Sequence, residues 1–171
     1  MRVLLPVIIC LISFTASTQT VIEINPSKDN TIADQTPDAS NGSGNVFFAG
    51  KTASKENKIF RALVQFDLSS IPADETISSV ELRLSVTKGA SGSDNKTYGL
   101  FKLSHDWGEG ASSSSNGSLE NAQNDDVTWE QRFFGTESPW DNPGGDFSAT
   151  VSAESVYEGT SEIPFSSDKL K

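Results

Sequence analysis

Cysteine and histidine are almost absent from this sequence. The 171-residue chain has one of each, Cys10 and His105. Cys10 lies in the apolar run near the start of the sequence. If this run is removed by cleavage, the remaining chain has no cysteine, and therefore neither a disulfide nor a reactive thiolate. The sequence also lacks a Gly-x-Ser-x-Gly elbow and a histidine pair suited to a metal. Although His105 beside Asp106 could act as a base, a lone loop histidine is usually solvated. We therefore expect a protein that is not an enzyme.

Positive charge is also scarce. Thirteen Lys and Arg face 23 Asp and Glu, for a formal net charge of -10. A chain this acidic repels nucleic acid and anionic membranes, so we expect no nucleic-acid partner. The few cations are unevenly spread, because Lys51, Lys55, Lys58 and Arg61 lie close together in the sequence.

The longest apolar run is too short to cross a bilayer. Arg2 precedes the apolar residues 3–14, which are followed by the small residues 15–17. A spanning helix needs about 20 apolar residues, whereas a charged start, a short apolar stretch and a small-residue end are typical of a secretory signal peptide. We expect cleavage after Ser17, with Thr18 and Thr20 as rivals, and a secreted protein whose single domain spans 18–171. The alternative is that this run is a buried first element of the fold.

No segment has a sustained helical period. Instead, short runs alternate between apolar and polar residues and are separated by segments rich in Gly, Ser, Asn, Asp and Pro. This pattern predicts an all-β fold, an antiparallel β-sandwich of jelly-roll type. We expect residues 110–126 to form a long, mobile loop. The predicted strands are 21–24, 46–49, 59–68, 77–87 and 98–103, with weaker ones at 127–130, 147–151 and 162–165.

Several motifs resemble one known family. They are "SKDNTI", "RALVQFDLSSIPADETISSVELRLSV", "LSHDWGEG", "VTWEQ" and "SPWDNPGGDFS", in this order. The sequence from about residue 23 to 150 resembles the secreted DNRLRE-type domains, grouped with carbohydrate-binding module family 96 and the disaggregatase-related repeats of archaea. The resemblance implies a jelly-roll sandwich that binds polysaccharide, alginate-like acidic polymers in characterised members. Such domains often accompany polysaccharide lyases. The family continues with further strands, whereas this sequence stops at "FSSDKLK", so we expect the domain to be incomplete at its C-terminal end.

Basic residues are the first candidates for a polysaccharide site. Arg61 and Arg83 lie on the polar sides of two predicted strands, Lys102 lies on the next strand, and Lys58 just precedes the first. If those strands share a sheet, the four residues form a basic stripe whose arginines can bind carboxylates in a bidentate manner. The alternative is ordinary solubility, with Arg83 paired to a cross-strand acid such as Asp67.

The three tryptophans are the second set of candidates. A flat ring in a loop can stack on the apolar face of a sugar, but such a ring more often packs inside a sandwich. We expect Trp107 and Trp129 to be packing residues. Trp140 has polar neighbours, so it is the one that we expect to be exposed and to bind sugar.

Two groups of acidic and amide side chains could hold a structural Ca²⁺, which prefers oxygen ligands. Neither group has the spacing of an EF-hand, and the same residue types also stabilise turns. The groups are Asp29 with Asn30 and Asp34, and Asp146 with Asp141 and Asn142.

Together, these observations predict a secreted, non-catalytic carbohydrate-binding module, possibly for acidic polysaccharide. One alternative is a structural or adhesive cell-surface domain. The other is the leading domain of a secreted polysaccharide-degrading enzyme, whose catalytic domain lies further along a longer chain. The sequence does not identify the polysaccharide, the binding face or the oligomeric state.

Overall fold

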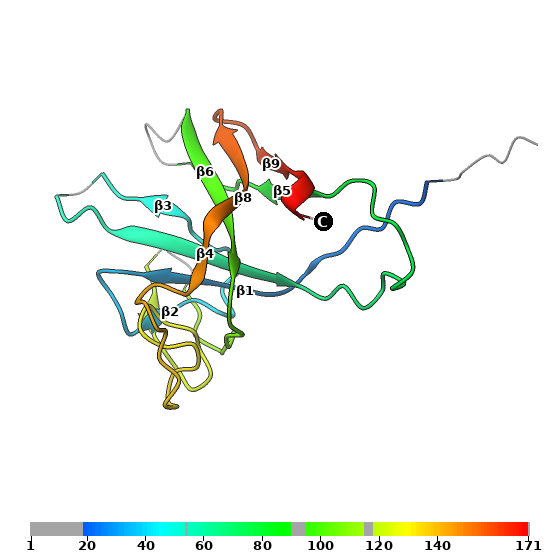
Figure 1. Cartoon of the computed structure of the whole chain (residues 1–171). Coiled ribbons are helices and arrows are strands. Elements are labelled where there is room, and N and C mark those ends of the chain that lie inside the picture. The colour runs from blue at the N-terminus through cyan, green and yellow to red at the C-terminus, as the bar shows by residue number, and fades with distance from the viewer. Residues whose placement is uncertain (1–18, 54, 90–94, 115–117, 171) are drawn as a thin grey trace, which may run out of the picture.

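A computed structural model describes residues 19–53, 55–89, 95–114 and 118–170 (Figure 1). The predicted signal peptide, residues 1–17, lies outside the described residues, so its role stays a prediction. Among the described residues, no helix has the length and apolar character needed to cross a membrane.

The described chain is built almost wholly from antiparallel strands. They form one sheet in the order β1-β4-β3 and three pairs, β2-β7, β5-β9 and β6-β8. This confirms the predicted all-β fold class and is consistent with a β-sandwich. The elements are β1 Pro26–Ala33, β2 Ala39–Ser40, β3 Gly50–Lys51, β4 Ile59–Phe66, β5 Glu81–Ser85, β6 Lys96–Leu103, β7 Glu120–Asn121, β8 Phe147–Tyr157, β9 Glu162–Ser166 and the 3₁₀ turn η1 Asp168–Leu170.

Three of the stronger predicted strands and two of the weaker ones are confirmed. They correspond to β4, β5, β6, β8 and β9, although β8 runs further than its apolar start suggested and β5 is shorter. The strand at 59–68 ends at Phe66, before Pro72, whose ring removes a backbone donor. The corresponding predicted segments are 59–68, 77–87, 98–103, 147–151 and 162–165.

Three predicted strands are wrong. Residues 21–24 have no regular structure, and the first strand is the following polar segment, β1. At 46–49, the amide of Phe48 donates to the Thr31 hydroxyl (2.8 Å) rather than to a neighbouring strand. At 127–130, the amide of Thr128 bonds Gln131 O (2.8 Å) in a tight turn. At 46–49 and 127–130, a hydrogen bond outside any strand ladder therefore takes the place of strand pairing.

The described parts of the segment 110–126, residues 110–114 and 118–126, are not simply a mobile loop. Ser112 and Ser114 are buried, and β7 lies within it. The Ser114 amide donates to Asn41 Oδ1 (2.6 Å), and the Ser112 amide donates to Asp126 Oδ1 (3.3 Å). Its composition is that of a loop, but its backbone is held by buried side chains.

Two apolar clusters hold the strands together. The first lies between the β1-β4 sheet and the chain that joins β6 to β8, and the second lies between the β6-β8 and β5-β9 pairs. Figure 1 shows β6 and β8 running across the three-stranded sheet, with β5 and β9 beside their upper part and the long connection at their lower end. The first cluster contains Ile32, Leu63, Trp107, Val127 and Trp140, and the second contains Ala153, Tyr157, Ile163 and Phe165.

The expected polar side of β4 is the side that faces the first cluster. Leu63 is 5% exposed, whereas Val64 and Phe66 are only half-buried. Leu63 pairs with Asn30 and Arg61 pairs with Ile32, so all four residues share one face of the sheet. Alternation shows that a strand has two faces, but the neighbouring segments decide which face is covered.

A buried amide, Asn30 of β1, connects three segments. Its Oδ1 accepts hydrogen bonds from Thr31 N (2.6 Å), Ser40 Oγ (3.0 Å) and Asn41 N (2.9 Å). Its Nδ2 donates to Glu109 O (2.7 Å). Asn30 is fully buried, so no water replaces these bonds at low cost.

We expect Asn30→Ala to destabilise the domain by about 3 kcal/mol, because each buried group left without a partner costs roughly 1–3 kcal/mol. Urea denaturation followed by tryptophan fluorescence measures the change. Asn45→Ala is the matched control, since Asn45 is exposed. Equal stabilities for the two variants would show that the Asn30 bonds contribute little.

Candidate functional site

The structure does not bring the four predicted basic residues together on one sheet. Lys58 precedes β4 and Arg61 lies on it, Arg83 lies on β5, and Lys102 lies on β6. These strands belong to three different sheets, so the condition for a basic stripe is not met. Whether each residue binds sugar stays a prediction.

Arg83 forms a local ion pair at the surface. Its Nη2 lies 3.0 Å from Glu81 Oε2 on the same strand, and both side chains are largely exposed. The hydrogen bond from Arg83 to Glu81 raises the pKa of the guanidinium. The predicted partner, Asp67, instead accepts a hydrogen bond from Ser69 N (2.9 Å). An exposed pair of this kind contributes little to stability.

Trp140 is buried, so its expected exposure is wrong. Its side chain is 4% exposed, lies in the first cluster and donates from Nε1 to Thr128 O (3.0 Å). A buried ring with a satisfied N–H packs the core and offers no face to a sugar. The polar residues beside it form the turn that brings the ring inward. Trp107 is likewise buried, as expected of a packing residue.

Arg61 lies against two aromatic rings. Its Cζ is 4.7 Å from the centroid of Trp129 and 5.0 Å from that of Phe147. Nη1 donates to Gly144 O (2.5 Å). Burial lowers the pKa of the guanidinium, and the nearby Asp34 opposes this change. The guanidinium is thus a half-buried cation whose plane is held by packing.

Two exposed phenylalanines extend this group of side chains. Phe101 and Phe147 are 45% and 41% exposed, and their ring centroids are 5.5 Å apart. The β6-β8 register shifts on both sides of Phe101, an irregularity that can re-aim a side chain. Arg61, Phe101, Trp129 and Phe147 are called the arginine–aromatic cluster below. It offers exposed apolar rings next to a cation.

A glycine makes the Arg61–Trp129 contact possible. Gly144 has φ of +90°, and a Cβ there would lie 2.5 Å from Arg61 Nη1 and 2.7 Å from the Trp129 ring. Its amide donates to Trp129 O (2.6 Å). The Gly-Gly pair of the "PGGDF" segment therefore lets the backbone approach the stacked side chains closely.

Asp146 fixes the turn that leads into Phe147. Its Oδ2 accepts from Asp141 N (2.9 Å), and its Oδ1 accepts from the Asn142 amide (2.8 Å) and Nδ2 (3.0 Å). Burial raises the pKa of the Asp146 carboxyl, but these hydrogen bonds and His105 lower it by more. His105 Nδ1 lies 3.6 Å from Asp146 Oδ2. The carboxylate therefore acts as a turn-stabilising acceptor.

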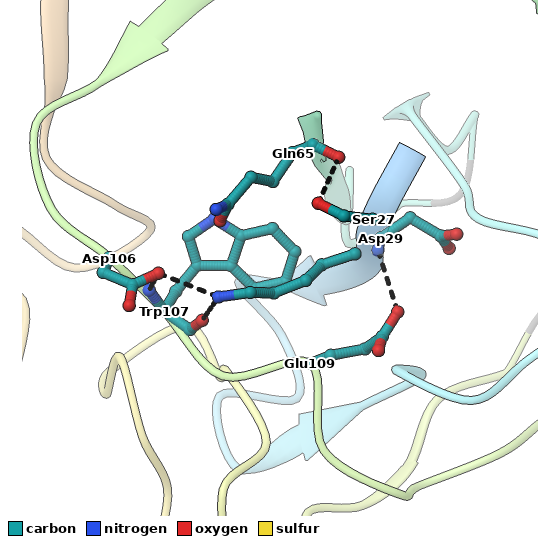
Figure 2. Close-up of polar contacts among 7 residues, drawn as sticks. Ser27, Asp29, Gln65, Asp106, Trp107 and Glu109 are labelled. Atoms are coloured by element: carbon teal, nitrogen blue, oxygen red, sulfur yellow. Dashed lines mark hydrogen bonds and ion pairs between the residues drawn. The ribbon is translucent and has the colours of Figure 1, made fainter. Parts of the chain in front are cut away.

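Asp29, the other predicted metal ligand, belongs to a polar group beside Trp107 (Figure 2). Lys28 Nζ donates to Asp106 Oδ1 (2.8 Å) and Trp107 O (2.9 Å), while the amide of Asp29 donates to Glu109 Oε1 (3.1 Å). Burial, and then the charge of Glu109, raise the pKa of the Asp29 carboxyl. These bonds tie the "HDWGEG" segment to β1.

Within the described ranges, no group of three or more His, Cys, Asp or Glu could hold a metal ion. Asp146 already accepts three hydrogen bonds from its own turn. A calcium ion at Asp29 or Asp146 stays a prediction, and nothing in the chemistry of the arginine–aromatic cluster requires it.

The aromatic members of the cluster were missed from the sequence. Phe101, Trp129 and Phe147 are far apart in the chain and were interpreted as strand or core residues. The available signal was the "GGDF" segment, whose glycines allow a close approach, but it does not show which arginine the segment meets.

We expect Asp146 to stabilise the folded domain at neutral pH and to lose this effect in acid. Its folded pKa lies below the ordinary value of 3.8, so the stabilisation is present above 3.8 and disappears as the pH falls through the folded pKa. Urea midpoints measured from neutral pH to about pH 3 test this. The Asp146→Asn variant should be less stable at neutral pH, and its urea midpoint should change less with pH than that of the unmodified domain.

Asp74→Asn, a change in an exposed loop, is the control. It should retain the acid dependence of the unmodified domain. The assignment is contradicted if Asp146→Asn and Asp74→Asn give the same pH profile.

Comparison with known proteins supports a role in carbohydrate binding. The model of carbohydrate-binding module family 96 matches residues 20–116, which is more than half of the chain. The match includes Arg61 and Phe101 and ends before Trp129 and Phe147. No curated protein and no solved structure shows a significant match. The chain belongs to carbohydrate-binding module family 96.

Proposed function

We propose that this protein is a secreted, non-catalytic module that holds acidic polysaccharide at the arginine–aromatic cluster. The observation that best supports this proposal is that Arg61 Cζ lies 5.0 Å from the ring centroid of Phe147, a residue that is 41% exposed. The leader-like residues 1–17 support secretion, and the family membership supports a binding role beside a catalytic domain in a longer chain.

The exposed rings supply the apolar half of a sugar site. A pyranose has a face of C–H groups that packs against an aromatic ring, and an exposed ring loses little on being covered. Phe101 and Phe147 are tilted by 58° to each other, so they form a bent surface rather than a flat one. A bent surface suits a sugar chain whose successive rings turn.

The guanidinium supplies the polar half. Arg61 makes one hydrogen bond to a described residue, although a guanidinium carries five N–H donors. The remaining donors suit a carboxylate, which accepts two of them in parallel. Asp34, the acid near Arg61, has an oxygen occupied by the Ile59 amide (2.8 Å). In a chain with a net charge of -10, such a held cation allows an acidic polymer to approach.

The groups around the cluster favour binding over chemistry. The single histidine, His105, lies beside Asp146, and that carboxylate is engaged in its turn. Hydrolysis of a glycosidic bond uses two carboxyl groups facing each other across the bond. The interactions of Arg61, Phe101, Trp129 and Phe147 place a cation and rings at the cluster instead.

We expect Phe147→Ala to weaken the binding of sodium alginate about 5-fold, because a lost ring contact costs about 1 kcal/mol. Affinity gel electrophoresis and calorimetry measure the change. Val156→Ala, an exposed apolar residue of the same strand, should bind like the unmodified domain. Equal affinity for the two variants would remove Phe147 from the site.

We expect Arg61→Lys to weaken alginate binding about 10-fold, since lysine keeps the charge but loses the planar fork that binds a carboxylate. Arg132→Lys makes the same chemical change at another half-buried arginine and should leave affinity unchanged. A neutral dextran serves as the second ligand. If Arg61→Lys and Arg132→Lys bind alginate equally well, the guanidinium is not the carboxylate contact.

A further inference from the structure

The β3-β4 hairpin carries positive charge that the arginine–aromatic cluster does not use. Lys51 lies on β3, Lys58 lies just before β4, and Lys55 lies between them in the sequence. Glu56 is the one acidic residue in the sequence of this hairpin. The hairpin is closed by the amide of Thr52, which donates to Lys58 O (2.9 Å). Among the described residues, none of the three lysines forms a salt bridge. An unpaired cationic hairpin on an acidic protein attracts anions.

The same hairpin carries half-buried aromatic rings. Lys58 Nζ lies 4.9 Å from the centroid of Phe60, and the Phe48 and Phe60 centroids are 6.3 Å apart. Phe48 is held in place because its amide donates to Thr31 Oγ1 (2.8 Å). The hairpin thus combines an ammonium group with ring surface, as the arginine–aromatic cluster combines a guanidinium with ring surface.

These rings lie on the other side of β4 from the arginine–aromatic cluster. Phe60 and Arg61 are consecutive residues of one strand, and consecutive side chains point to opposite faces of a sheet. The pairing agrees, since Phe60 lies opposite Ala33 and Arg61 lies opposite Ile32. A ligand at Phe60 and a ligand at Phe147 therefore approach from different sides of the strand.

We propose that Lys58, Phe48 and Phe60 form a second subsite for an acidic sugar, so that one molecule binds two segments of acidic polysaccharide. This inference rests on the proposed function, because it assumes that the first segment binds at the arginine–aromatic cluster. Lysine binds a carboxylate as a point charge rather than as a fork. We therefore expect the hairpin subsite to be less selective for the orientation of the carboxylate than the Arg61 subsite. Its affinity should also depend more strongly on the salt concentration.

The position of Lys58 is compatible with this role. Its ammonium group lies over the Phe60 ring without an ion pair among the described residues, and a lysine side chain at the surface changes rotamer within nanoseconds. When a sugar covers the ring, the ammonium can move to the ring edge and meet a carboxylate there. Screening by salt acts on such a charge at the protein surface.

The test measures stoichiometry with a short alginate oligosaccharide and cross-linking with sodium alginate. The variants are Lys58→Gln for the hairpin and Phe147→Ala for the arginine–aromatic cluster. Lys88→Gln is the matched control, because it removes the same charge from an exposed lysine elsewhere on the domain. Calorimetry reports oligosaccharides bound per chain, turbidity reports cross-linking, and circular dichroism checks that each variant is folded.

The proposal expects two oligosaccharides per chain and cross-linked alginate for the unmodified domain and the matched control. Each test variant should bind one oligosaccharide and lose the turbidity, and the hairpin variant should lose most of the salt dependence.

If the hairpin variant equals the matched control while Phe147→Ala loses binding, the second subsite is refuted and the proposed function stands. If the unmodified domain binds no oligosaccharide, the proposed function fails. If the hairpin variant alone abolishes binding, the arginine–aromatic cluster is the wrong site and two-point binding is refuted.

Discussion

The fold depends on a buried side-chain amide. Asn30 accepts hydrogen bonds from the backbone of β1 and from the segment around Ser40, and it donates to the backbone near Glu109. Asn41 continues the network by accepting from Ser114 N (2.6 Å) and donating to Val46 O (2.8 Å). Loops that would otherwise expose unpaired backbone groups are therefore tied to one strand, without a disulfide. The apolar clusters can be small because this network defines the position of the long connections.

The arrangement of charge is the second constraint on function. A net charge of -10 disfavours any anionic ligand, and cations that are fixed and partly shielded from solvent oppose this effect most strongly. Arg61 meets this requirement through its ring contacts and its bond to Gly144 O. Arg83 does not, because Glu81 accompanies it at an open surface. The useful cations are thus distinguished by their surroundings and not by their residue type.

The sequence predicts the strands whose stability comes from apolar packing. The alternation at β4, β5 and β6 is strong, and these strands form close to the expected positions. It does not predict β1, because residues such as Asn30 and Thr31 are polar and are buried through hydrogen bonds. Hydrophobic periodicity cannot detect such a strand. The alternation in β4 also assigned Leu63 to the polar side of the strand, but that side faces the first cluster.

The candidate site was only partly predictable. Arg61 was identified from its residue type, but its role depends on Trp129 and Phe147, which a single sequence does not place beside it. Trp140 was chosen for its polar neighbours, and those neighbours form the turn that buries it. Long-range contacts decide whether a ring is exposed, and local composition does not report them.

Arg61 of β4 lies over the ring of Phe147, the first residue of β8. Arg61 belongs to the sheet that borders one cluster, and the strand of Phe147 continues into the other. A sugar chain lying over this contact would touch both β4 and β8. Its binding energy would then oppose separation of the two strands, so a module pulled by its own polymer would be strengthened at the contact that holds the polymer.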